Sequence, residues 1–170
     1  MLRVSRFALA AAFAVFAGAC AVGNPAGSFA PGSSAASVIE RLGPPTAQHA
    51  TPAGGRRLEY GGGAFGRRTA MLDFDASDRL VASDQVRTEA HFNTIQAGMS
   101  AAEVRARIGA PSTTWPIARQ NQVVWSYRYE TPFCQWFMVG VGTDDRVVDT
   151  AYGPDPLCDD NFFHRFRLHD

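Results

Sequence analysis

The amino-acid sequence contains one stretch twice. Residues 32–46 read Gly-Ser-Ser-Ala-Ala-Ser-Val-Ile-Glu-Arg-Leu-Gly-Pro-Pro-Thr, and residues 98–112, 66 positions later, repeat eight of these fifteen residues. A second pair of segments, 71–81 and 138–148, matches at an offset of 67, as expected for a duplicated unit with one inserted residue. An internal repeat constrains the whole fold, because each copy must form the same small packing unit. Two copies of such a unit build a binding surface more readily than an active site.

The second copy carries the clearer signals for a short helix. Ser100 followed by Glu103 has the pattern of a capping box, and Val104 with Ile108 places two apolar side chains on one helix face. Gly109 is expected to end this helix in a left-handed conformation. The corresponding residues of the first copy are Ser34, Ser37, Val38, Leu42 and Gly43. Because a serine replaces the glutamate there, we predict a helix with a weaker N-terminal cap.

Three β-strands are expected after each helix, because runs of β-branched and aromatic residues are separated by turn residues. The predicted strands are residues 57–60, 69–74 and 79–86 in the first copy and residues 123–129, 133–141 and 147–152 in the second. Residues 89–95 are predicted to form a further short helix. The predicted fold class is therefore α+β, with two repeats of a short helix or helices followed by a three-stranded antiparallel meander.

The N-terminus has the pattern of a secretory signal peptide. Arg3 and Arg6 precede an apolar run and a small-residue cleavage site, so residues 1–19 are predicted to be removed. The following Cys20 resembles the acylated cysteine of bacterial lipoproteins, and the alternative is an incidental thiol after an ordinary cleavage site. Two acyl chains would anchor the chain stably. Ala21, at the position where aspartate signals inner-membrane retention, implies the outer membrane.

The rest of the chain divides into a linker, two repeats and a tail. Residues 20–34 are rich in Gly, Ala, Ser and Pro, which predicts a lipidated N-terminus followed by a flexible linker. The first, degenerate repeat is assigned to residues 35–88, the second to residues 89–158, and the C-terminal tail to residues 159–170. The tail alternates Phe and Arg. We expect it to dock on the domain, and contact with membrane headgroups or a partner is the alternative.

Charge and cysteine content narrow the classes of function. Removal of residues 1–19 leaves 151 of the 170 residues, enough for one domain with a core or for two small ones. All sixteen basic residues are arginine, and 14 of them remain beside 16 acidic residues, so nucleic-acid binding is not expected. Apart from Cys20, the chain has two cysteines, Cys134 and Cys158. An even number of cysteines in an exported domain predicts a disulfide. Two free thiols or a metal pair are the alternatives.

The sequence lacks the motifs of catalytic and cofactor sites. His49 and His91 have no partner at catalytic spacing, and His164 with His169 are expected in a solvated tail, with a metal pair as the alternative. The glycine cluster 61–66 lacks the Lys-Ser/Thr ending of a phosphate loop, and Asp73, Asp75 and Asp78 lack the Gly and distal Glu of an EF-hand. We therefore expect no enzyme activity, no cofactor and no metal site.

Aromatic and arginine residues of the second repeat are the candidates for partner binding. Trp115 precedes Pro116 in the segment expected to join helix and strand, where an exposed tryptophan would be a binding anchor. Arg128 and Tyr129 are the candidate residues beside it. Trp125 and Trp136 lie on predicted strands and are expected in the core.

Three segments of the second repeat together resemble the SmpA/OmlA domain, known as BamE in the β-barrel assembly machinery. They are residues 92–100 with Val104, Ile108-Gly109-Ala110-Pro111-Ser112, and Val124-Trp125-Ser126-Tyr127. The resemblance implies a small outer-membrane lipoprotein that acts as an accessory subunit and not as an enzyme. The tandem arrangement also resembles the β-lactamase-inhibitor protein, which is built from two related units.

We therefore expect a non-catalytic outer-membrane lipoprotein that faces the periplasm of a Gram-negative bacterium. Its expected role is a protein-binding or envelope-maintenance module, with envelope or β-barrel assembly proteins as partners. The alternative is a periplasmic inhibitor or ligand-binding module similar to the tandem inhibitor protein.

Overall fold

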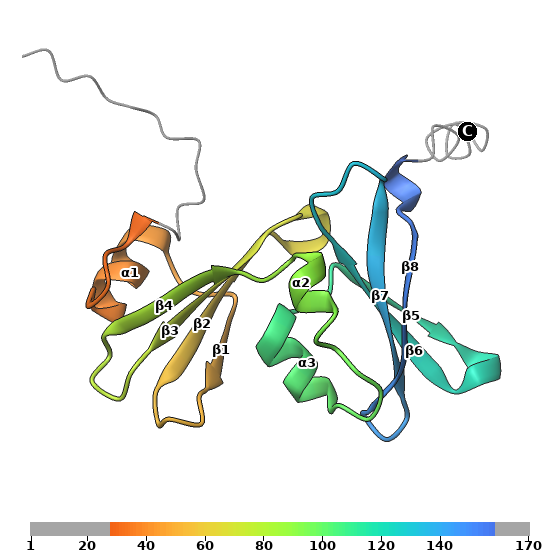
Figure 1. Cartoon of the computed structure of the whole chain (residues 1–170), viewed down its shortest axis with the longest axis horizontal. Helices are drawn as coiled ribbons and strands as arrows, with labels where there is room; N and C mark the ends of the chain where they lie inside the picture. Colours follow the sequence, from red (N-terminus) through yellow and green to blue (C-terminus); the bar gives the residue numbers. More distant parts are fainter. Residues whose placement is uncertain (1–27, 159–170) are drawn as a thin grey trace, which may run out of the picture.

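The chain forms two four-stranded antiparallel sheets with short helices, and the computed structural model describes residues 28–158 (Figure 1). The first unit consists of α1 (Ala35–Leu42), β1 (Ala47–Ala50), β2 (Arg56–Gly61), the 3-10 turn η2 (Gly63–Phe65), β3 (Thr69–Phe74) and β4 (Leu80–Gln85). The second unit consists of α2 (Glu89–Phe92), α3 (Ala101–Ile108), β5 (Thr113–Ile117), η3 (Ala118–Gln120), β6 (Gln122–Arg128), β7 (Gln135–Gly142), β8 (Val147–Pro154) and η4 (Pro156–Cys158). Within each sheet, the strands pair in chain order.

The predicted fold class, two repeats of helix plus three-stranded meander, is wrong. Each sheet has a fourth strand, β1 or β5, which lies at the sheet edge beside β2 or β6. The sequence of β1 is Ala-Gln-His-Ala, which has little strand propensity, and β5 contains Pro116. Proline is tolerated at a sheet edge, where no neighbouring strand needs its missing N–H group. Pairing with the adjacent strand, and not local propensity, therefore makes these two segments strands.

The duplication extends to backbone details of the two units. Gly43 after α1 has φ +83° and ψ −174°, and Gly109 after α3 has φ +81° and ψ −173°. This differs from the left-handed cap expected at Gly109 and belongs to a region that glycine adopts almost alone. The turn residues Asp78 and Asp145 both have positive φ, at 59° and 57°. Each sheet also has a register shift between its third and fourth strands, at Asp73/Phe74 and at Gly140/Val141.

The helix caps follow the sequence prediction. Ser100 accepts a hydrogen bond from the backbone N–H of Glu103, and the Glu103 carboxylate accepts one from the Ser100 N–H at 2.9 Å. In the first unit, Ser34 accepts from the N–H of Ser37 at 3.2 Å, without a returning carboxylate. The second helix therefore has the complete capping box and the first has half of it.

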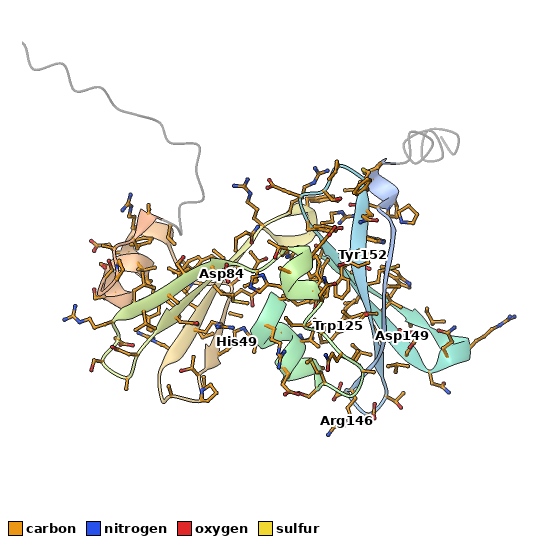
Figure 2. The ribbon with its side chains drawn as sticks, viewed as in Figure 1. His49, Asp84, Trp125, Arg146, Asp149 and Tyr152 are labelled. Atoms are coloured by element: carbon orange, nitrogen blue, oxygen red, sulfur yellow. A yellow bond between two sulfur atoms is a disulfide. The ribbon has the colours of Figure 1, made fainter. Side chains whose placement is uncertain are left out.

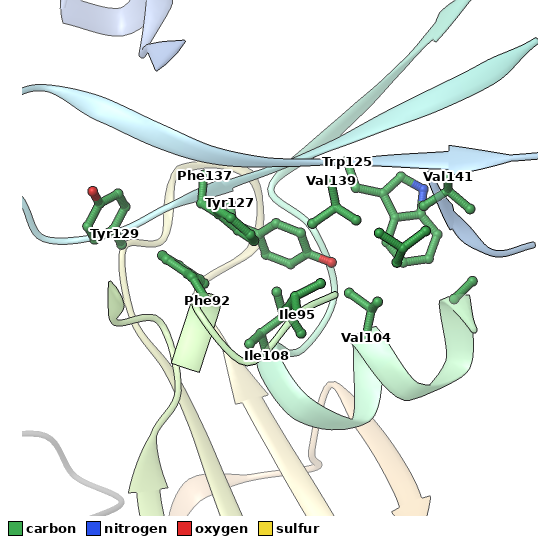
Figure 3. Close-up of a cluster of buried hydrophobic side chains, with 12 residues drawn as sticks. Phe92, Ile95, Val104, Ile108, Trp125, Tyr127, Tyr129, Phe137, Val139 and Val141 are labelled. Atoms are coloured by element: carbon green, nitrogen blue, oxygen red, sulfur yellow. The ribbon is translucent and has the colours of Figure 1, made fainter. Parts of the chain in front are cut away.

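Each sheet packs one face on its own helix. The first core joins α1 to the inner face of the first sheet, and its fully buried members include Val38, Leu58 and Leu72. The second core joins α2 and α3 to the second sheet and is richer in aromatic residues (Figure 3). There the ring of Phe92 stacks on Phe137 with centroids 4.5 Å apart.

Helices and sheets alternate along the molecule, in the order α1, first sheet, α2 with α3, second sheet (Figure 1). Residues 28–34, expected to be part of the flexible linker, contact the first unit. Phe29 packs against the first core, and Leu80 exchanges backbone hydrogen bonds with Gly32 and Ser33. These seven residues therefore extend the first unit.

Candidate functional site

The two units meet where the end of α3 contacts the outer face of the first sheet, which is the face turned away from α1. The buried carboxylate of Glu59 on β2 accepts a hydrogen bond from the backbone N–H of Ala110 at 2.9 Å. Arg57, on the same strand, donates to the carbonyl of Ala106 in α3 at 2.7 Å. A Cβ atom at Gly109 would lie 2.9 Å from both Glu59 Oε1 and Thr69 Cγ2. A larger residue at this position would therefore force Glu59 or Thr69 to shift.

Arg87 stabilises the same junction. It lies in the segment between β4 and α2, which connects the two units. Its guanidinium is buried and donates to the carbonyl of Gly66 in the first unit at 2.9 Å. It also donates to Ser112 Oγ and to the carbonyl of Ala110 in the second unit, both at 2.7 Å. Burial lowers the pKa of this guanidinium. It donates further to the carbonyl of Arg128 at 3.2 Å, and hydrogen bonds to three segments make Arg87 a structural centre of the interface.

A polar groove of about 330 Å³ lies beside this junction, between the outer face of the first sheet and α2 with α3. An ion pair of Arg57 with Asp73 and a contact of 2.9 Å between His91 Nε2 and Asp84 Oδ2 line it. The hydrogen bond to Asp73 raises the pKa of Arg57. His91 also contacts Thr88 Oγ1, but this hydroxyl caps α2 and is therefore engaged in a helix terminus. The Thr88–His91–Asp84 arrangement is therefore a helix cap beside a histidine–carboxylate contact, not a nucleophile with its base.

The second sheet has an outer face of its own, which we call the open face. Strand register places the following residues on it: Trp115, Val124, Ser126, Arg128, Trp136 and Met138. None of them belongs to either of the two hydrophobic cores that residues 28–158 form. The same face of the first sheet carries the equivalent cross-strand pairs: His49–Arg57 corresponds to Trp115–Val124, and Glu59–Met71 corresponds to Ser126–Met138. In the first unit this position is covered by α3 of the second, and in residues 28–158 no third unit follows to cover the open face.

Four side chains form an aromatic–arginine ladder across the open face. The guanidinium carbon of Arg128 lies 5.9 Å from the ring centroid of Phe65 and 5.1 Å from that of Trp136. Trp136 in turn stacks on Trp115, with ring centroids 5.2 Å apart and planes inclined by 28°. The ladder therefore runs Phe65, Arg128, Trp136, Trp115, with a cation held between two rings.

The ladder has a rigid centre and accessible ends. Arg128 forms a bidentate pair with Asp155 through Nε at 2.7 Å and Nη2 at 3.0 Å, and only a small fraction of either side chain is exposed. Its third nitrogen donates to the carbonyl of Ala64 at 2.6 Å, so the loop 61–66 of the first unit reaches the second sheet. Phe65 at one end is 74% exposed, and Trp115 at the other is partly exposed. Flat rings fixed by a buried ion pair are suited to contact another protein.

The structure separates the three residues predicted as partner contacts. Trp115 lies in β5, not in a loop, and is partly exposed on the open face. Arg128 is buried at the centre of the ladder. Tyr129 is buried on the opposite face, where its ring meets Phe92 edge to face at 5.1 Å and its hydroxyl bonds Glu89 and Gln135 (Figure 3). Burial raises the pKa of the Tyr129 hydroxyl. Tyr129 is therefore part of the core side of the sheet, and of the three only Trp115 reaches the surface.

Two further residues of the site were not singled out from the sequence. Phe65 lies in the glycine cluster 61–66, which lacks the pattern of a phosphate loop, and Arg87 lies in the connection between the repeats. Phe65 could have been found from the sequence, because a phenylalanine among glycines in a loop is expected to be exposed. A large exposed apolar side chain often marks a contact surface. No local pattern marks Arg87, because its partners are distant in sequence.

Cys134 and Cys158 form a disulfide, with Cα atoms 6.1 Å apart. It joins the segment before β7 to the turn after β8, close to the pair of Asp155 with Arg128. The predicted signal peptide, Cys20 and the tail lie outside the described residues.

Within residues 28–158, no helix is long and apolar enough to cross a membrane. The same part of the chain contains no group of three or more His, Cys, Asp or Glu side chains that could hold a metal ion.

Comparisons with known proteins give no family. No family model matches the chain, and no curated protein matches it. Among solved structures, a DUF4309 family protein (YjgB) from Bacillus subtilis is similar, with a TM-score of 0.29, 10% identity and coverage of 72% of this chain and 79% of that one. An extracellular protein containing a SCP domain from Bacillus anthracis has a TM-score of 0.29 and 9% identity, and the match covers 73% of this chain and 44% of that one.

Proposed function

We propose that this protein is a non-catalytic envelope module that binds a protein partner through the open face of its second sheet. The observation that carries the proposal is the aromatic–arginine ladder, which ends in an exposed Phe65 and a partly exposed Trp115. Binding energy at protein interfaces concentrates in Trp, Tyr and Arg residues that are held rigidly. A partner that covers the ladder would bury these rings without first having to order them.

The same proposal places the protein on the periplasmic side of the outer membrane, held by lipid at Cys20. It is supported by the charged and apolar N-terminus that precedes Ala-Gly-Ala-Cys, and by a disulfide further along the chain. A role close to β-barrel assembly rests on the resemblance of the second repeat to the SmpA/OmlA domain.

Site-specific crosslinking in cells tests the binding surface. Benzoylphenylalanine placed at position 115 should capture a partner, whereas the same probe at position 81 in β4 should not. Val81 is exposed on the first sheet, remote from the ladder, and therefore controls for nonspecific capture. Recovery of β-barrel assembly subunits would support the assembly role, and recovery of a soluble hydrolase would support the inhibitor alternative. Equal capture from both positions would contradict the proposed surface.

Metabolic labelling tests the anchor separately. Palmitate should label the wild-type chain and leave Cys20→Ser unlabelled. Cys134→Ser is the matched control, because it removes a different cysteine and should keep the label. Equal labelling of wild type and Cys20→Ser would refute the anchor without affecting the proposed binding face.

A further inference from the structure

Residues 28–158 bury Val124, Ser126, Arg128 and Trp136 of the open face and leave the rest of it accessible. Met138 and Trp115 are partly exposed, and Asp149 and Ala151 on β8 are exposed. Figure 2 labels Asp149 on the second sheet, and the strand register puts it opposite Gly140. The accessible part of the face therefore presents the indole ring of Trp115, the thioether of Met138 and the carboxylate of Asp149.

The first unit shows which part of the chain covers such a face. After its last strand, β4, the chain turns through Arg87 into α2 and α3, and the end of α3 lies on the outer face of the first sheet. The segment in the corresponding place of the second unit is the one that follows β8. It comprises Asp155, η4 and the tail, residues 159–170.

The chain leaves the second unit beside the ladder. Asp155 pairs with Arg128, and its N–H donates to the carbonyl of Cys134 at 3.0 Å. Cys158 is joined to Cys134 by the disulfide. Cys158, the last described residue, is therefore held at the end of the second sheet where Arg128 and Asp155 pair.

The tail matches this face in length and chemistry. Its sequence is Asp-Asp-Asn-Phe-Phe-His-Arg-Phe-Arg-Leu-His-Asp, with four large apolar residues and two arginines. Twelve residues span about 18 Å as a helix or about 40 Å when extended. Three strand spacings, the width of a four-stranded sheet, amount to about 14 Å. In either conformation the tail can cross the face, and Arg165 and Arg167 can approach Asp149.

We propose that the tail docks on the open face of its own chain, with Phe162, Phe163 and Phe166 against the exposed part of the ladder. The docked tail takes the place that α3 occupies on the first sheet.

Crosslinking in the purified chain tests the docking without any partner. Benzoylphenylalanine at position 163 should link within one chain to the peptides that carry Trp115 or Met138. Asp149→Arg should reduce this link, and Arg119→Asp, an exposed change in η3, should leave it unchanged. Links between chains would assign the tail to a second copy and overturn the proposal. Links to lipid alone, in vesicles of phosphatidylglycerol and phosphatidylethanolamine, would also overturn it.

Tryptophan quenching gives an independent measurement. In a chain that ends at Cys158, the acrylamide quenching constant should rise, because the docked tail covers Trp115, the one partly exposed tryptophan among the three, whereas Trp125 and Trp136 are buried with or without the tail. The full-length variant with Phe162, Phe163 and Phe166 changed to Ser should give the same rise in the quenching constant. This variant keeps the chain length and therefore controls for misfolding of the shortened chain. Unchanged quenching in both variants would refute docking. Because no partner is present, this result is distinguishable from failure of the proposed function.

Discussion

The carboxylate of Glu59 on the first sheet accepts a hydrogen bond from the N–H of Ala110, directly after the helix of the second unit. Its second oxygen contacts His49 Nε2 at 3.2 Å, and Figure 2 labels this histidine on the first sheet. The duplication thus joins the units asymmetrically: the end of one helix rests on the other unit's sheet, whereas within residues 28–158 no helix covers the equivalent face of the second sheet. Glycine at position 109 makes the contact possible.

Substitution of two equivalent glycines distinguishes the cost of backbone strain from the cost of a close contact with the neighbouring unit. Gly43 and Gly109 share the same φ and ψ within a few degrees, yet a Cβ meets nothing within 4 Å at Gly43 and meets Glu59 and Thr69 at Gly109. Gly43→Ala should lower the free energy of unfolding by on the order of 1–2 kcal/mol through strain alone. Gly109→Ala should cost about 1–3 kcal/mol more, because it also overpacks the interface. Urea unfolding measures both, and equal losses would contradict the close fit.

Local signals predicted the helices, whereas the edges and faces of the sheets depended on distant contacts. Ser100 and Glu103 encode their cap within four residues, so the sequence sufficed. Strand β5 exists because it pairs with β6, and its own residues include a proline. The sequence also could not place Arg128, since the loop that covers it lies more than sixty residues earlier.

Arg87 should be more sensitive to substitution than any exposed arginine. Arg87→Lys keeps the charge but loses the planar fork that reaches Gly66, Ser112 and Ala110 together. Buried acceptors left without donors should lower the free energy of unfolding by about 2–4 kcal/mol. Arg119→Lys on the exposed η3 turn should stay within about 0.5 kcal/mol of wild type. A small loss at both positions in urea unfolding would mean that Arg87 does not fasten the units.

The capping box predicts a pH-dependent contribution to stability. Hydrogen bonds from Ser100 lower the pKa of Glu103 in the folded chain. Because the pKa of Glu103 is lower in the folded chain, the ionised carboxylate stabilises the fold at pH values above the unfolded pKa. This stabilisation is lost as the pH falls through the folded pKa. Glu103→Ala should therefore lower Tm at pH 7 and have a smaller effect near pH 3. Ser37→Glu should add the missing half of the first box and raise Tm at pH 7 only. A Tm difference independent of pH would argue against the ionised cap.

The disulfide should stabilise the second unit and hold the chain beside the ladder. Cys134 and Cys158 are separated by 24 residues, and closing a loop of this length contributes on the order of 3 kcal/mol in the chain-entropy model. The double variant Cys134→Ser, Cys158→Ser should lose about that free energy of unfolding, and reduction of the wild type with dithiothreitol should give the same loss. The reductant should leave the double variant unchanged, which controls for other effects of thiols. Because Asp155 lies inside the closed loop and pairs with Arg128, the double variant should also loosen the ladder. Near-ultraviolet circular dichroism of the stacked tryptophans measures this change, and an unaltered spectrum would show that the Arg128–Asp155 pair suffices to hold them.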